Sequence, residues 1–119
     1  MPVHKDFIEY VRELLAPLGH VRIKPMFGAA GVYLDEVFFA VMDEDALYFR
    51  VDDQTKDRFA EAGSAPFTFA EKDGRVIEMA YWRAPDEAMD GPEACEPWAR
   101  LGYEAALRKK AGAKRKKKP

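Results

Sequence analysis

The sequence has few of the residues that build metal centres and disulfides. It contains one cysteine and two histidines in 119 residues. Cys95 alone cannot form an internal disulfide or a cysteine-based metal cluster, and His4 and His20 would need further ligands to hold a metal. We therefore predict no metal site and no cofactor, and a reducing cytoplasm as the location.

Long apolar runs are missing as well. No segment approaches the roughly 20 apolar residues that cross a bilayer. The first six residues are not followed by the apolar segment of a signal peptide. We expect a cytoplasmic protein that does not contact membranes.

Apolar residues are nevertheless plentiful enough for a packed core. They make up 48% of the chain, with 13% aromatic residues, which favours one folded domain over disorder. A strand over residues 37–42 is apolar on both faces, so either helices cover both faces or a partner does. Homodimerisation is the simplest use of such a surface. The aromatic residues that could line a binding groove, although a sheet core is the preferred interpretation, are Phe38, Phe39, Tyr48, Phe67, Phe69, Tyr81 and Trp82.

Positive charge is concentrated at the C-terminal end. Residues 108–119 contain eight positive side chains and no carboxylate, which leaves 11 positive against 21 negative side chains in residues 1–107. We predict a globular domain over residues 1–107 and a basic, disordered tail over residues 108–119. The tail either contacts nucleic acid weakly and without sequence specificity or only solubilises the protein. Its candidate nucleic-acid contacts are Lys109, Lys110, Lys114, Arg115, Lys116, Lys117 and Lys118.

The apolar spacing predicts helices at both ends of the chain and a sheet between them. A stripe with helical spacing predicts a helix over Lys5–Leu18, and a second helix is expected over roughly Glu93–Lys109, with Pro97 in its first turn. Strands are expected at 21–24, 32–34, 37–42, 47–51, 67–69 and 76–82, joined by tight turns, with a short helix before Gly63. The prediction is an α+β two-layer sandwich, with an antiparallel sheet of about six strands flanked by the terminal helices.

The segment Lys24–Leu34 holds the most distinctive pattern. Its two glycines beside a lysine suggest a phosphate loop, but the apolar residues that follow are typical of a strand and not of a helix N-terminus. The glycines therefore more plausibly shape a turn or a bulge that leads into the sheet. The alternative is an interaction surface, whose candidate residues are Lys24, Met26, Phe27, Gly28 and Gly31.

Residues for catalysis are not arranged in any recognised pattern. Ser64 lacks the second glycine of a nucleophile elbow, and acidic neighbours of Cys95 would raise its thiol pKa. We predict no catalytic residue. An enzyme would require a pocket in which carboxylates converge.

Several short motifs follow one another in the order known from one family. Met26-Phe27-Gly28, Gly31-Val32-Tyr33 and Phe39-Ala40 resemble the signature of the TfoX N-terminal domain family. Further similarities occur at residues 48–52, 63–67, 79–82 and 98–100, so that the resemblance extends from about Phe7 to Ala106. The departures are Lys24, Ala29 and Glu36, where the family usually has arginine, glycine and glycine.

The resemblance implies an α+β sandwich without catalytic residues. The type member of the family is a regulator of natural competence that promotes transcription of DNA-uptake genes, and it carries a second, helical domain where this chain has its lysine-rich end. The first hypothesis is accordingly a stand-alone, non-enzymatic regulatory or adaptor domain that acts through protein contacts. The second is a nucleic-acid-associated protein that uses the basic tail.

Overall fold

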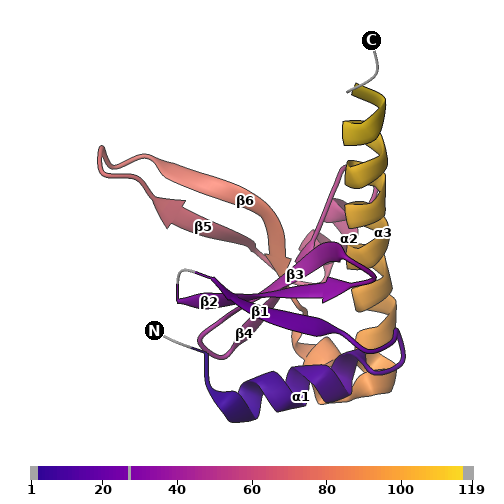
Figure 1. Cartoon of the computed structure of the whole chain (residues 1–119). Helices are drawn as coiled ribbons and strands as arrows, with labels where there is room; N and C mark the ends of the chain where they lie inside the picture. Colours follow the sequence, from indigo (N-terminus) through magenta and orange to yellow (C-terminus); the bar gives the residue numbers. More distant parts are fainter. Residues whose placement is uncertain (1–2, 27, 117–119) are drawn as a thin grey trace.

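The computed structural model describes residues 3–26 and 28–116. Six strands and four helical segments follow one another along the chain, as Figure 1 shows. In order they are α1 (Lys5–Leu15), β1 (Arg22–Met26), β2 (Ala29–Leu34), β3 (Val37–Asp43), β4 (Ala46–Arg50), α2 (Lys56–Glu61), β5 (Pro66–Ala70), β6 (Val76–Arg83), the 3-10 helix η1 (Asp86–Asp90) and α3 (Pro92–Lys116).

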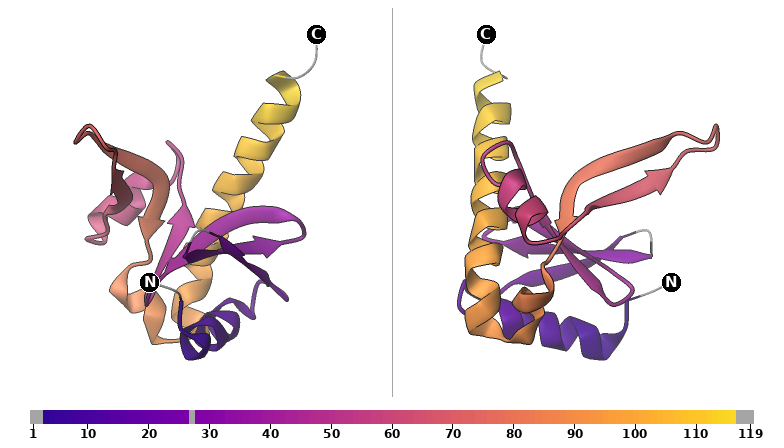
Figure 2. Two further views of the ribbon diagram at one scale, coloured as in Figure 1. Left: turned by 60° about the vertical axis from the view of Figure 1, so that its left-hand side comes forward. Right: turned by 180° about the vertical axis from the view of Figure 1, so that it is seen from behind.

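The strands form one antiparallel sheet in the order β1-β2-β3-β4-β6-β5. Every neighbouring pair is antiparallel, as short connections require. The sheet and the helices at both ends of the chain confirm the predicted α+β fold. The β5–β6 hairpin curves away from the other strands and projects as an arm (Figure 2).

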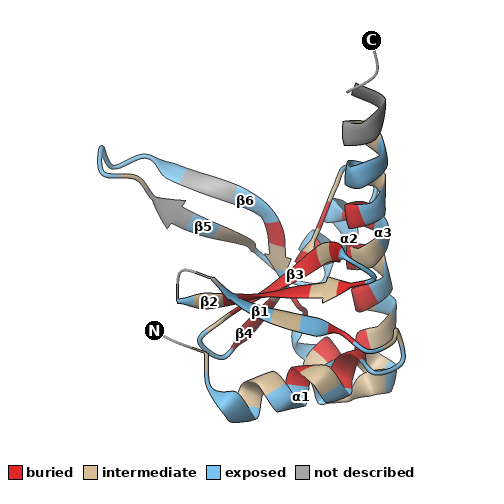
Figure 3. Ribbon diagram, viewed as in Figure 1, coloured by how far each residue is buried: buried red, intermediate tan, exposed pale blue. Residues whose placement is uncertain are grey.

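One face of the sheet packs against α1 and α3 and forms the core. The buried stripe of α1 consists of Val11, Leu14 and Leu15, each with an exposed fraction of 0%. It joins side chains such as Phe39 and Phe49 from the central strands in one apolar cluster. Figure 3 shows this buried layer between the sheet and the helices.

Close contact between α3 and the sheet depends on a glycine in the helix. A Cβ atom added at Gly102 would lie 3.0 Å from the Cβ of Phe49. Because that distance is shorter than an ordinary carbon contact, only glycine lets α3 pack this closely on β4.

The last helix is longer than the sequence analysis predicts. α3 ends at Lys116, beyond the expected end near Lys109, and its last turns project past the sheet (Figure 2). It begins at Pro92, so Pro97 lies beyond the first turn, which is a correction to the expected placement. The backbone is thus helical on both sides of Leu107, and the division there into domain and tail stays a prediction.

The distinctive glycine segment divides between a turn and a strand. Gly28 has a φ of +81° in the turn between β1 and β2, a conformation that favours glycine. Gly31 instead lies within β2, where it pairs with Lys24 and Val41. Pro25 belongs to β1, an edge strand of the sheet, where its missing N–H is tolerated.

Candidate functional site

The face of the sheet turned away from α1 and α3, which we call the open face, carries aromatic and arginine side chains. Strand alternation places Tyr48 and Arg50 opposite in direction to the buried Phe49. Their register partners in β6 are Arg83 for Tyr48 and Tyr81 for Arg50, so these side chains share the open face. Tyr48 and Arg50 are half-buried and Arg83 is exposed, whereas Tyr81 is buried, with an exposed fraction of 7%.

A continuous row of ring and guanidinium contacts joins residues of five strands, β1, β2, β3, β4 and β6, on the open face. The guanidinium of Arg22 lies 4.8 Å from the ring centroid of Tyr33, and Tyr33 stacks on Phe38 at 5.0 Å. Phe38 meets Tyr81 at 5.5 Å, and the Arg50 guanidinium lies 5.4 Å from the Tyr81 ring. Stacked rings and cation–π pairs stiffen these side chains, of which Tyr81 is buried and the others remain partly accessible.

Burial affects the two tyrosines of this face that lie on the central strands. It raises the pKa of Tyr81, against an opposing effect of Arg50. It also raises the pKa of Tyr48, which stacks on Phe67 with ring centroids 4.8 Å apart. Both phenols are therefore neutral at physiological pH and act as hydrogen-bonding, apolar surfaces rather than as charges.

The interaction surface predicted around the glycines lies at the β1–β2 edge of the sheet. Lys24 is exposed and sits opposite the buried Gly31, so the structure brings these two residues together. Gly28 is exposed in the turn. Phe27 and the side chain of Met26 lie outside the described residues. The role of this group in binding stays a prediction.

A pocket of about 270 Å³ lies where α3 passes the end of the open face. Arg50, Phe38 and Tyr81 contribute to it from the sheet, and Lys109 and Lys110 from α3. The remaining wall residues are Glu36, Val37 and Ala106. Two of the predicted tail lysines, Lys109 and Lys110, therefore lie next to the aromatic row. Lys114, Arg115 and Lys116 lie further along α3, and their side chains are not described. Lys117 and Lys118 lie outside the described residues.

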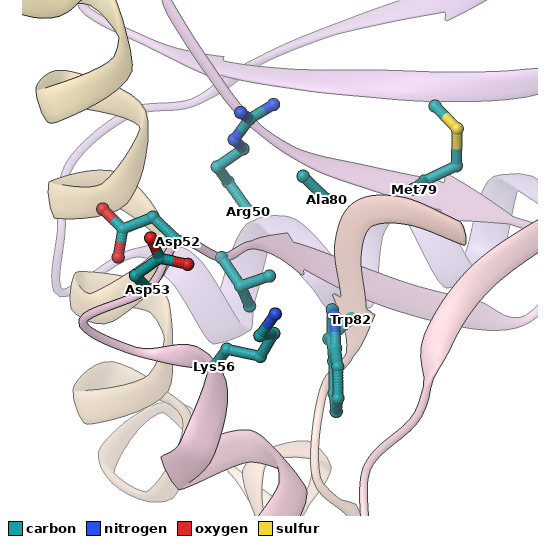
Figure 4. A pocket seen from close by; sticks show the side chains of 8 residues that line it. Arg50, Asp52, Asp53, Lys56, Met79, Ala80 and Trp82 are labelled. Atoms are coloured by element: carbon teal, nitrogen blue, oxygen red, sulfur yellow. The ribbon is translucent and has the colours of Figure 1, made fainter. Parts of the chain in front are cut away.

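A second hollow, of about 420 Å³, lies between the start of α2 and β6. Figure 4 shows Lys56 extending toward Trp82, with Asp52 and Asp53 together on the side of α3. The Asp52 carboxylate accepts hydrogen bonds from Arg108 Nε at 2.6 Å and Nη2 at 3.0 Å. The Arg108 hydrogen bond holds the pKa of Asp52 below its usual range, so this carboxylate is ionised and anchors α3.

The remaining residues with reactive side chains, Cys95 and Ser64, have contacts that indicate a role in the fold. Cys95 is buried in the core, and burial raises its thiol pKa to about 12, so it is not a reactive thiolate. The hydroxyl of Ser64 donates a hydrogen bond to the Arg83 carbonyl at 2.5 Å. Within residues 3–26 and 28–116, no three His, Cys, Asp or Glu side chains gather as metal ligands do. No described helix combines the length and the apolar character needed to cross a membrane.

Sequence reasoning named Phe38 and Tyr81 but missed Tyr33 and Arg50. Both missed residues are half-buried and lie on strands next to buried residues, and this alternation is the signal that would assign them to the open face. Nothing local in the sequence connects Arg50 with Lys109 and Lys110. They meet only because α3 crosses the end of the sheet.

These features define a small α+β domain in which helices cover one sheet face and the other presents rings and cations. The TfoX N-terminal domain model matches residues 13–106, and the chain belongs to this family. The chain is also similar to Protein Sxy of Escherichia coli (strain K12), with 24% identity over 100 residues. That match covers 84% of this chain and 47% of the relative, so the chain spans about half the length of the curated relative it matches.

Proposed function

We propose that this chain is a non-enzymatic regulatory domain that binds a protein partner through its open face, in the control of competence or transcription. The observation that carries the proposal is the row of rings and arginines on that face, in which every member except Tyr81 is at least partly accessible. Aromatic and arginine side chains are enriched in protein interfaces, because they bury much surface for little lost conformational freedom. Family membership supports the regulatory part. The single, buried cysteine fits action in the cytoplasm.

The edge of the open face offers charges that can be changed without disturbing the core. Arg22 and Lys24 are both exposed on β1. The double variant Arg22→Glu/Lys24→Glu reverses two charges there. Lys5→Glu/Lys72→Glu is the matched control, because both of these lysines are exposed and lie elsewhere on the molecule.

The experiment deletes the gene in its native host and measures transcripts of DNA-uptake genes during complementation. We expect the deletion to lower these transcripts, the wild type and the matched control to restore them, and the β1 variant to fail. Unchanged transcripts after deletion would contradict the link to competence. Full complementation by the folded β1 variant would remove the open face as the binding surface.

Association with nucleic acid is the second candidate function. The observation that favours it is the exposure of Lys109 and Lys110 in the C-terminal half of α3. It predicts binding to duplex DNA that weakens steeply as salt rises, because bound lysines release counterions. Duplex binding that does not change with salt would contradict this role.

A further inference from the structure

The pocket at the end of the open face collects positive charge from distant parts of the chain. Arg50 ends β4, and Lys109 and Lys110 lie on α3. None of the three takes part in an ion pair among the residues that the structure describes. The Arg50 Nε atom is buried and has no hydrogen-bond partner there either. A buried donor without a partner is costly, so Arg50 is a cation whose hydrogen-bonding capacity the described residues do not fully use.

The nearby carboxylates leave most of this charge uncompensated. Glu36 is the one acidic residue in the pocket wall, and its carboxylate faces Arg22 at 3.5 Å. Asp52, two residues from Arg50, is held by Arg108. Asp35 lines a neighbouring hollow beside Lys110 without forming an ion pair with it within the described chain. Three cations against one carboxylate give the pocket an excess of positive charge, which favours an anion over a cation.

The walls of the pocket also offer apolar surface. Phe38, which is half-buried, lies there next to Val37, and the buried Tyr81 lies behind the Arg50 guanidinium. A volume of about 270 Å³ is at the small end of ligand pockets, which suits one compact molecule or one unit of a chain. Three separate cations match the several oxygens and double charge of a phosphate better than a single carboxylate, because arginine offers a fork of donors and each lysine a point charge.

We propose that this pocket binds a nucleotide, with its phosphate at Arg50, Lys109 and Lys110 and its base beside Phe38. The ligand can be a free nucleotide or one unit of a single strand, since both present the same phosphate and ring. The site goes beyond the proposed protein-binding function and does not depend on it. Variants of Arg22 and Lys24 test the protein-binding function, whereas variants of Lys109 and Lys110 test nucleotide binding, so the two proposals can fail independently.

The test is calorimetric titration of the full chain with the four ribonucleoside 5′-monophosphates, with inorganic phosphate and with a single-stranded oligonucleotide. The double variant Lys109→Ala/Lys110→Ala removes two exposed charges of the pocket. The matched control is Lys5→Ala/Lys72→Ala, which makes the same change in net charge elsewhere. Arg50→Gln tests the partly buried cation, after circular dichroism and thermal unfolding have established that it folds.

We expect at least one monophosphate to bind more tightly than inorganic phosphate, and more weakly as salt rises. The pocket variant and Arg50→Gln should each weaken binding by about tenfold or more, as the loss of charge-assisted hydrogen bonds implies. The matched control should stay within about twofold of the wild type. If the oligonucleotide competes with the monophosphate, the site also accepts a strand; if it does not bind, the ligand is the free nucleotide.

Two results would overturn the proposal. One is the absence of binding by all four monophosphates and by the oligonucleotide at millimolar concentration. The other is an equal loss of binding in the pocket variant and the matched control, which would assign the effect to net charge alone.

Discussion

The two faces of the sheet are built from similar residues but have different surroundings. Phe39 and Phe49 on the helix-covered face have an exposed fraction of 0%, and Phe39 meets Tyr103 of α3 edge to face. Phe38, the chain neighbour of Phe39, lies in the row on the open face and remains half-buried. An aromatic residue in a strand is therefore not necessarily a core residue, because the alternation of side chains along the strand decides which rings face the helices.

An irregularity in β3 places two consecutive residues on the buried side of the strand. Ala40 pairs with Val32 and Phe38 with Tyr33, so Phe39 is left without a register partner in β2. The extra residue of such a bulge breaks the alternation, and both Phe39 and Ala40 are buried. Phe38 remains on the open face, so the bulge accounts for only part of the apolar pattern, and homodimerisation through that face stays a prediction.

The largest expected contrast comes from two adjacent phenylalanines. We expect Phe39→Ala to lower the free energy of unfolding by about 3–5 kcal/mol, because it leaves a cavity in the core. Phe38→Ala should lower it by about 1–2 kcal/mol, because its ring is already half solvated. Urea unfolding of both variants measures the difference. Equal losses would contradict the distinction between the faces.

A glycine pair in α3 gives the next contrast, with effects of opposite sign. Gly102→Ala places its methyl group 3.0 Å from the Cβ of Phe49, and we expect a net loss of about 1–2 kcal/mol even after the gain in helix propensity. Gly112→Ala, with no atom within 4 Å of the added Cβ, should be stabilising by up to about 1 kcal/mol. Thermal unfolding of the two variants provides the comparison. A stabilised Gly102→Ala variant would mean that α3 is free to shift away from the sheet.

Much of the fold follows from local patterns in the sequence. The apolar stripe of α1 occurs where its spacing predicts a helix, and β5 and β6 pair as the predicted strands joined by a tight turn. Gly74 in that turn has a φ of +91°, a conformation that favours glycine. The end of α3 lies beyond the predicted end near Lys109. The lysines and arginine of this stretch, with Ala111 and Ala113, are good helix formers, which agrees with a helix that extends to Lys116.

The candidate site is harder to predict from the sequence than the fold, because its residues come from segments far apart in the chain. The Gly28–Gly31 segment attracts attention in the sequence, yet Lys24 and Gly31 lie at the sheet edge, away from the described pocket wall. Arg50 looks like an ordinary strand residue until β4 and α3 are placed side by side. Only tertiary structure brings it to Lys109 and Lys110.

The ion pair between Arg108 and Asp52 joins α3 to the residues just after β4, next to the exposed lysines of the helix. We expect Arg108→Gln to lower the free energy of unfolding by about 1 kcal/mol, because a bidentate, partly buried pair is lost. The matched control is Arg100→Gln, which loses an exposed pair with Glu96 in the same helix; it should cost about 0.3 kcal/mol. Urea unfolding at low salt measures both. A harmless Arg108→Gln would show that this contact does not hold α3.

The same pair predicts a pH dependence. Arg108 lowers the pKa of Asp52 in the folded chain, so Asp52 contributes stability above its ordinary pKa near 4 and loses it as the pH falls through the lowered value. The difference in unfolding free energy between the wild type and Asp52→Asn should therefore be largest near neutral pH and shrink in acid. A difference that stays constant between pH 7 and pH 2 would contradict the assignment.

The smallest effect is expected for the charges at the edge of the open face. Arg22 and Glu36 lie 3.5 Å apart with side chains that are 54% and 79% exposed, and such pairs contribute about 0–0.5 kcal/mol. Arg22→Gln should therefore leave the urea midpoint almost unchanged, while removing a cation from the row of rings. This combination distinguishes a residue that serves binding from one that serves the fold. A loss above about 1 kcal/mol would instead make the Arg22–Tyr33 contact part of the folded structure's stability and would weaken the case for a binding face.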